Sequence, residues 1–167
     1  MSQLGRYFAE GSTYFVTNVT FNRMRILVEH IDLLHHAIAK QQEAVPFDLI
    51  AWVVLPGHFH AVIDPINHDL SDLLQRIKLS FSTSFRKRAG WKSGRVWQLR
   101  FWDHVIRDQE DMNTHLDYIH YNPVKHGFAK SPFVYPHSSA QQFLKEGFYL
   151  PNWGAQDDVV MDGDFGE

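Results

Sequence analysis

The chain of 167 residues contains no cysteine. This absence excludes a disulfide framework, a thiolate zinc site and a cysteine nucleophile, so any metal or covalent chemistry must use other side chains. Long apolar runs are also missing, since none approaches the roughly 18 residues of a membrane-spanning helix. The first six residues lack the basic segment followed by an apolar one that marks a secretory leader. We therefore predict a cytoplasmic protein with no membrane partner.

The formal net charge of −3 hides two segments of opposite charge. Residues 157–167 hold five acidic residues and no basic one, whereas residues 76–107 hold nine basic residues and one acidic residue. A local excess of positive charge is typical of a phosphate-binding surface, although a solvated helix face carries the same pattern. We predict a single domain over residues 1–156 and a mobile acidic tail over residues 157–167.

Hydrophobic periodicity predicts an alternation of strands and helices. We expect strands at residues 13–21, 49–55, 59–64 and 104–107, with residues 6–8 at the sheet edge. We expect helices at residues 26–43, about 69–90 and 109–121, and a short helix near 139–145. Pro123 is expected to stop the third helix. This order of elements predicts an α+β fold, with helices packed on an antiparallel sheet.

Two histidines follow a predicted tight turn in the segment Leu55-Pro56-Gly57-His58-Phe59-His60. Because side chains alternate faces along a strand, His58 and His60 point the same way and bring two imidazoles into one small volume. Neutral imidazole is a common metal ligand, and a site at the mouth of a strand would still admit a substrate. A histidine in an apolar strand also has a simpler role in packing, so the pair needs a third ligand and a reactive group.

Tyr118 and Asn122 lie four residues apart at the end of the third predicted helix, and therefore share one of its faces. Core packing of the tyrosine and helix capping by the asparagine are the simpler roles. Tyr121 is a rival candidate for a reactive tyrosine, because it lies three residues from Tyr118 on a neighbouring part of the face.

Taken together, these segments resemble the HUH single-tyrosine transposases. The resemblance rests on His58-Phe59-His60 and on His115-Leu116-Asp117-Tyr118-Ile119-His120-Tyr121-Asn122-Pro123-Val124-Lys125-His126-Gly127. Further matches are Ala51-Trp52-Val53-Val54-Leu55-Pro56 and Trp97-Gln98-Leu99-Arg100-Phe101-Trp102-Asp103-His104. The chain is most similar to the branch associated with repetitive extragenic palindromes (REPs) of bacterial chromosomes, from about residue 6 to residue 136.

The resemblance implies the ferredoxin-like sandwich of HUH endonucleases, a central antiparallel sheet flanked by helices. It also implies Tyr118 as the catalytic nucleophile, with His58, His60 and Asn122 as ligands of Mg²⁺ or Mn²⁺. The implied activity is metal-dependent cleavage and rejoining of single-stranded DNA at hairpins of repetitive palindromes, through a 5′-phosphotyrosine intermediate. The implied protein is nucleoid-associated and a monomer, with a dimer left open because related insertion-sequence transposases are dimers.

Candidate DNA contacts come from the basic segment, where cations alternate with aromatic residues that can stack on bases. They are Arg86, Lys87, Arg88, Lys92, Arg95 and Arg100. The N-terminal segment of the resembled family adds Arg6 and Tyr7 near the recognition end. Packed core tryptophans would explain several of the aromatic residues equally well.

Some features leave alternatives open. His115, one turn before Tyr118, is a candidate base for a phenol whose pKa is near 10. Gly57 stands where some relatives have a carboxylate, so Asp64 is either a substitute metal ligand or a turn residue. The acidic tail either is solvated or folds over the basic groove as an inhibitor. A catalytically inert hairpin-binding protein and a metal phosphodiesterase that uses water are the alternative functions.

Overall fold

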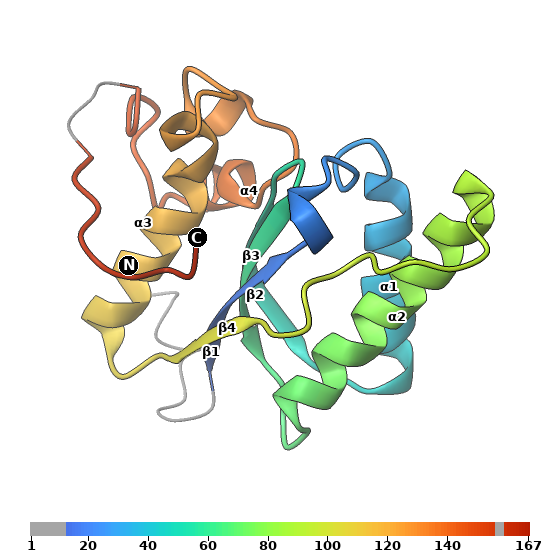
Figure 1. Ribbon diagram of the computed structural model, residues 1–167. Helices are drawn as coiled ribbons and strands as arrows, with labels where there is room; N and C mark the ends of the chain where they lie inside the picture. The colour runs from blue at the N-terminus through green and yellow to red at the C-terminus, as the bar shows by residue number, and fades with distance from the viewer. Residues whose placement is uncertain (1–12, 156–158) are drawn as a thin grey trace.

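The computed structural model describes residues 13–155 and 159–167 (Figure 1). Its described strands, β1 (Tyr14–Val19), β2 (Asp48–Val54), β3 (His58–Asp64) and β4 (Trp102–Val105), form one sheet in the order β2-β3-β1-β4. Every neighbouring pair is antiparallel. The predicted α+β fold with a central antiparallel sheet flanked by helices is confirmed.

Helices cover both faces of the sheet (Figure 1). One face packs against α1 (Ile31–Ala44) and α2 (Leu70–Ala89), and the other against α3 (Gln109–Lys125) and α4 (Ala140–Lys145). Along β3, Phe59, Ala61 and Ile63 enter the core of the first layer, while Val62 enters that of the second. The alternation of side chains therefore places His58 and His60 on the α3 face.

The first helix begins later than the sequence predicts. Residues before it form a 3₁₀ turn, η2 (Phe21–Arg23), in which Asn22 and Arg23 have positive φ angles of 53° and 52°. Leu27 is fully buried and its backbone N–H donates to the oxygen of Pro56 at 2.9 Å. The apolar residues at 26–30 are therefore packed in a turn that precedes the helix, and the predicted helical start at residue 26 is wrong.

The third helix continues beyond its predicted end at residue 121, through Pro123 to Lys125. Pro123 lies in the last turn, where its missing N–H costs one helical hydrogen bond, and the N–H of His126 still donates to the oxygen of Asn122 at 3.0 Å. The prediction that Pro123 stops the helix is therefore wrong. As a consequence, Tyr118, Asn122 and Lys125 lie at i, i+4 and i+7 on one helix face.

The other elements agree closely with their predictions. Helix α2 begins after Asp69, whose Oδ1 accepts a hydrogen bond from the N–H of Asp72 at 2.8 Å, and ends at Gly90 with a left-handed φ of 71°. Strand β4 lies two residues earlier than expected, and a second 3₁₀ turn, η3 (Pro132–Val134), precedes α4. Residues 6–8 lie outside the described residues. No described helix is long and apolar enough to cross a membrane.

Candidate active site

The two histidines occupy the start of β3, next to the central strand β1. His58 and His60 are 8% and 0% exposed, and their ring centroids are 5.0 Å apart. Thr17 of β1 lies opposite His60 in the strand register, with 2.7 Å between Thr17 Oγ1 and His60 Nδ1. The β1–β3 pairing therefore holds the His60 ring in one orientation.

Thr17 also determines which nitrogen of His60 faces the site. Its hydroxyl donates its single proton to the backbone oxygen of Phe165 at 2.6 Å, so it accepts a hydrogen bond from Nδ1 of His60. Burial lowers the pKa of His60 to about 4, more than the nearby Glu167 carboxylate raises it, so the ring is neutral. A neutral ring with its proton on Nδ1 would present the lone pair of Nε2 to a cation, whereas the contact with Oε1 of Glu167 at 2.8 Å requires a proton between the two atoms, so the carboxylate and a cation compete for this nitrogen.

Helix α3 brings the other two predicted residues to the same place. Tyr118 is 1% exposed, with its ring centroid 5.3 Å from that of His60, and Asn122 is fully buried one turn later. The hydroxyl of Tyr118 accepts a hydrogen bond from Nζ of Lys125 at 3.2 Å. The structure thus gathers His58, His60, Tyr118 and Asn122, which are far apart in sequence, at one point between β3 and α3.

The last residue of the chain lies at the centre of this group. Oε1 of Glu167 is 2.8 Å from Nε2 of His60 and from Nδ2 of Asn122, and 3.4 Å from Nε2 of His58. Oε2 is 2.7 Å from Nζ of Lys125. Nε2 of His126 lies 3.1 Å and 3.2 Å from the two oxygens. Five side chains, from β3, α3 and the residue that follows α3, therefore surround one carboxylate.

Three of these residues, Lys125, His126 and Glu167, had no predicted role in the sequence. Lys125 and His126 belong to the segment that carries the resemblance, and only the continuation of α3 places Lys125 on the face of Tyr118. Glu167 lies 107 residues from His60, its partner in a hydrogen bond, and no local pattern encodes such a contact. The acidic charge of the tail was the one signal that pointed to a cationic partner.

The atoms around the site fit a divalent cation. Among the described residues, Oδ1 of Asn122 and Nε2 of His58 are buried without a hydrogen-bond partner, and Nε2 of His60 beside them contacts only Oε1 of Glu167, at 2.8 Å. The ligating atoms of His58, His60 and Glu167 all lie within 4.8 Å of one another. Buried acceptors that converge without donors are the arrangement that a cation satisfies. Metal binding by His58, His60 and Asn122 stays a prediction that this geometry supports.

The positions of Asp64 and Gly57 show whether either could provide an acidic metal ligand. Asp64 ends β3, six residues or about 20 Å along the strand from His58, and its Oδ1 accepts a hydrogen bond from the N–H of Ile66. It is a turn residue. A Cβ at Gly57 would lie 3.0 Å from the backbone oxygen of Arg23, so a side chain before the histidine pair would require the η2 turn to shift by a few tenths of an ångström.

The contacts between the carboxylate and its neighbours shift the pKa values of both Tyr118 and Glu167. Burial raises the pKa of Tyr118 well above its usual value, and the nearby Glu167 raises it further. Burial alone would raise the pKa of Glu167, but the close contacts of its carboxylate with His126, His58, His60 and Lys125 hold it well below its usual range. In this structure the phenol is therefore neutral beside a charged carboxylate.

Aromatic packing anchors the end of the tail. The ring of Phe165 stacks on that of Tyr118, with centroids 3.7 Å apart and planes 7° apart, and Phe165 is 7% exposed. Gly166 has a φ of +75°, and a Cβ there would overlap Cβ and Cγ of Trp102. The chain end runs beside α3 in Figure 1. Residues 159–167 thus have a packed position over the site, while the mobility of the tail in solution stays a prediction.

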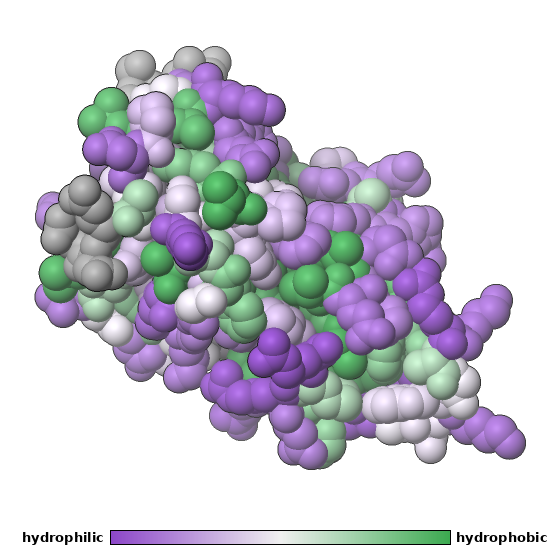
Figure 2. All heavy atoms as spheres, turned by 90° about the horizontal axis from the view of Figure 1, so that it is seen from above, coloured by the Kyte–Doolittle hydropathy of each residue, from purple (hydrophilic) through white to green (hydrophobic). Residues whose placement is uncertain are grey.

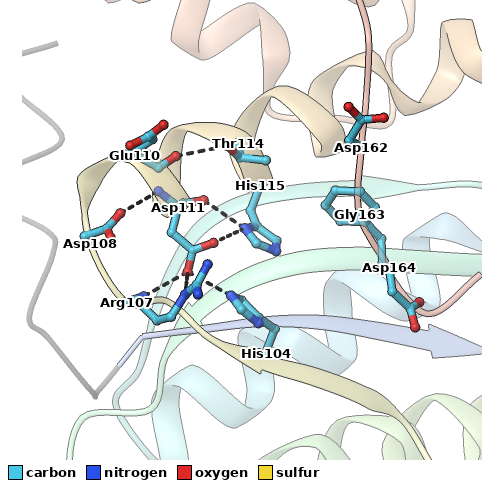
Figure 3. Close-up of a pocket in the computed structure, with 11 residues that line it drawn as sticks. His104, Arg107, Asp108, Glu110, Asp111, Thr114, His115, Asp162, Gly163 and Asp164 are labelled. Carbon is cyan, nitrogen blue, oxygen red and sulfur yellow. Dashed lines mark hydrogen bonds and ion pairs between the residues drawn. The ribbon is translucent and has the colours of Figure 1, made fainter.

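A second cluster of titratable groups lies at the other end of α3 (Figure 3). Oδ2 of Asp111 is 2.8 Å from Nε2 of His104 and accepts a hydrogen bond from the N–H of Arg107 at 2.9 Å. Nδ1 of His115 is 2.8 Å from the backbone oxygen of Asp111. The tail residues 162–165 line the same groove of about 450 Å³. His115 is thus held toward Asp111, and within the described residues no hydrogen bond joins it to Tyr118 to support a role as base.

We expect Asp111→Asn to destabilise the protein in a pH-dependent way. Burial would raise the pKa of Asp111, but hydrogen bonds from Arg107 and His104 lower it to about 2. An unfolded aspartate has a pKa of about 3.9, so the charged form contributes about 2 kcal/mol above pH 4, which is lost as the pH falls through 2. Urea denaturation at pH 7 and at pH 2.5 checks this, with exposed Asp103→Asn as control; equal effects at both pH values would contradict it.

The predicted DNA contacts fall into separate places. Arg88 forms a bidentate pair with Asp32 of α1, at 2.9 Å and 2.6 Å, and Nε of Arg86 donates to the oxygen of Gly94 at 3.0 Å. Both lie near the C-terminal end of α2, and Figure 2 shows hydrophilic side chains projecting at the end of the molecule that holds α1 and α2.

The other predicted DNA contacts have no such ion pair or backbone partner in the described residues. The guanidinium of Arg95 lies 5.1 Å over the ring of Phe21. Lys87, Lys92 and Arg100 are exposed. Arg6 and Tyr7 lie outside the described residues.

Comparison with known proteins identifies the class. The family model described as "Transposase IS200 like" matches residues 9–122. A REP-associated tyrosine transposase of Escherichia coli (strain K12) is 37% identical over 92% of this chain and 91% of its own length. A putative REP-associated tyrosine transposase of Haemophilus influenzae (strain ATCC 51907 / DSM 11121 / KW20 / Rd) is 34% identical over 98% of this chain and 99% of its own.

A solved structure agrees with these relatives. The structure of a REP-associated tyrosine transposase bound to a REP hairpin superposes with a TM-score of 0.80 at 35% identity, covering 97% of this chain and 94% of that one. The chain belongs to the IS200-like transposases and, within them, to the REP-associated tyrosine transposases. The family predicted from the sequence is confirmed.

Proposed function

We propose that the chain is a metal-dependent endonuclease and strand transferase for single-stranded DNA, which acts at hairpins of repetitive palindromes through a 5′-phosphotyrosine at Tyr118. The observation that carries this proposal is the convergence of the Tyr118 hydroxyl, the two imidazoles and Asn122 around one buried anion position. The hairpin bound in the related structure supports the choice of DNA partner.

Each residue then has a chemical role. A divalent cation held by His58, His60 and Asn122 would take the place of Oε1 of Glu167 and supply positive charge to a phosphate bound beside it, on the side where Oε2 contacts Lys125. Imidazole ligands suit Mn²⁺ at least as well as Mg²⁺, which prefers oxygen ligands. Tyr118 attacks phosphorus, and a 3′-hydroxyl leaves. The phosphotyrosine bond conserves the energy of the phosphodiester, so attack by another 3′-hydroxyl rejoins the strands.

The DNA contacts and the assembly are part of the proposal. Exposed Lys87, Lys92, Arg95 and Arg100 would hold phosphates, with Arg95 and Phe21 offering a cation beside an aromatic face. Arg86 and Arg88 are engaged by protein partners and would contribute less in this arrangement. We propose one catalytic domain over residues 1–156 that acts as a monomer, since all of the proposed catalytic and metal-binding residues come from one chain.

Removal of the metal tests this function against its alternatives. Hairpins of repetitive palindromes from the genome that encodes the chain are labelled at the 5′ or 3′ end and incubated with Mn²⁺ or with EDTA. On a denaturing gel we expect the 3′ label, which marks the fragment with the 5′-phosphate, to migrate with the protein in Mn²⁺ only. Binding without an adduct would favour the inert hairpin-binding protein, and two free fragments would favour hydrolysis by water.

A further inference from the structure

Lys125 contacts both the nucleophile and the anion position. Its Nζ donates to the hydroxyl of Tyr118 at 3.2 Å and lies 2.7 Å from Oε2 of Glu167. The ammonium is also 4.8 Å from the centroid of the Tyr118 ring. Its side chain is 40% exposed, so the charge is accessible to a ligand that enters from solvent. Lys125 is therefore positioned between the attacking oxygen and whatever anion occupies the site.

The Glu167 carboxylate marks where such an anion binds. A carboxylate presents two oxygens that share one negative charge, as do the two non-bridging oxygens of a phosphodiester, and both are recognised by charged N–H donors. Oε2 is bound by Lys125 and Oε1 by Asn122, while His126 reaches both oxygens. The side chain of Glu167 is 16% exposed, so this is a largely enclosed anion site.

We propose that Lys125 is a further catalytic residue, which binds the scissile phosphate at the position of Oε2 of Glu167 while it holds the hydroxyl of Tyr118. The proposal rests on the proposed function. In the step, a bond forms between the Tyr118 oxygen and phosphorus, and the bond between phosphorus and the 3′ oxygen breaks. The phenol proton passes to water and the 3′ oxygen takes a proton from water, so no net proton is consumed.

An ammonium at this position acts where negative charge develops. During attack the two non-bridging oxygens gain charge, and one N–H of Lys125 reaches them while another stays on the Tyr118 oxygen. A positioned charged donor of this kind contributes about 10²-fold to 10³-fold to a rate. Helix α3 holds Lys125 seven residues from Tyr118, so the donor and the nucleophile keep their relative positions.

A purely structural role for Lys125 gives the opposite expectation. If Lys125 only anchors the tail through Glu167, then Lys125→Met would release the tail and leave the adduct rate equal to or above that of the unchanged chain. If Lys125 acts on the phosphate, then Lys125→Met lowers the rate even though it loosens the tail. The sign of the change therefore separates the two roles.

Single-turnover formation of the covalent adduct on a labelled palindromic hairpin in Mn²⁺ tests the proposal, with hairpin affinity measured separately by fluorescence anisotropy in EDTA. We expect Lys125→Met to lower the rate about 100-fold with an affinity within threefold of the unchanged chain. Lys125→Arg, which keeps the charge, restores the rate to within about tenfold. Lys145→Met, an exposed change on α4, is the matched control and leaves both values unchanged.

The outcomes are distinct. An unchanged or raised rate in Lys125→Met, with an adduct that depends on Tyr118, would overturn the role of Lys125 and leave the proposed function intact. A parallel loss of rate and affinity would also overturn it, because it would show binding of DNA in general. Absence of an adduct from the unchanged chain in every condition would overturn the proposed function, and the role of Lys125 with it.

Discussion

Tyr118→Phe is expected to abolish the covalent protein–DNA adduct, whereas Tyr121→Phe leaves it in place. The hydroxyl of Tyr118 is the one held by Lys125 beside His60 and Asn122. The ring of Tyr121 instead packs edge-on against Trp153, with centroids 6.4 Å apart, on another side of α3. Loss of a covalent nucleophile lowers the rate by at least about a thousandfold.

The denaturing gel with 3′-labelled hairpin measures both variants under the same conditions. We expect Tyr118→Phe to keep its hairpin affinity and its folding, because the ring and its stacking on Phe165 remain. An adduct that persists in Tyr118→Phe and disappears in Tyr121→Phe would transfer the nucleophile role to Tyr121. Cleavage to free fragments by Tyr118→Phe would support hydrolysis by water.

Deletion of residues 165–167 is expected to accelerate adduct formation by at least about tenfold. Phe165 covers the ring of Tyr118, and Glu167 occupies the five donor and ligand side chains that a phosphate and a cation would need. Because Glu167 is tethered to the site, it competes with the phosphate at an effective concentration on the order of millimolar, so its removal is expected to relieve inhibition by about tenfold or more. The deletion also removes the carboxylate that raises the pKa of Tyr118.

Gly166→Ala tests the same effect without removing any residue. The added Cβ would overlap Cβ and Cγ of Trp102 and the backbone has a φ of +75°, so we expect the tail to leave its position. Val160→Ser, a change at an 81% exposed tail residue, is the control that keeps the contacts at the site. Equal rates in the deletion and in Gly166→Ala would show that the tail does not compete with DNA, and lower rates in both would show that the tail contributes to the active site.

Much of the fold follows from local patterns. β-Branched and aromatic residues predicted β1, and two apolar runs separated by Pro56 and Gly57 predicted the β2–β3 hairpin. The capping residues Asp69 and Gly90 predicted the limits of α2 within one residue. The failures have local causes too. Buried residues in the turn before α1 imitate a helical pattern, and Pro123 is tolerated because it lies in the last turn of α3.

For the candidate site, the sequence by itself determined which residue types were available and on which face of each element they lie. Period 2 in β3 set His58 and His60 on one face, and period 3.6 in α3 set Tyr118 and Asn122 on one face. Only the tertiary structure decided that these faces meet, that Lys125 joins Tyr118, and that Glu167 enters between them. The physical reason is range: strand and helix periodicity acts over a few residues, whereas a contact between His60 and Glu167 depends on how the whole chain packs.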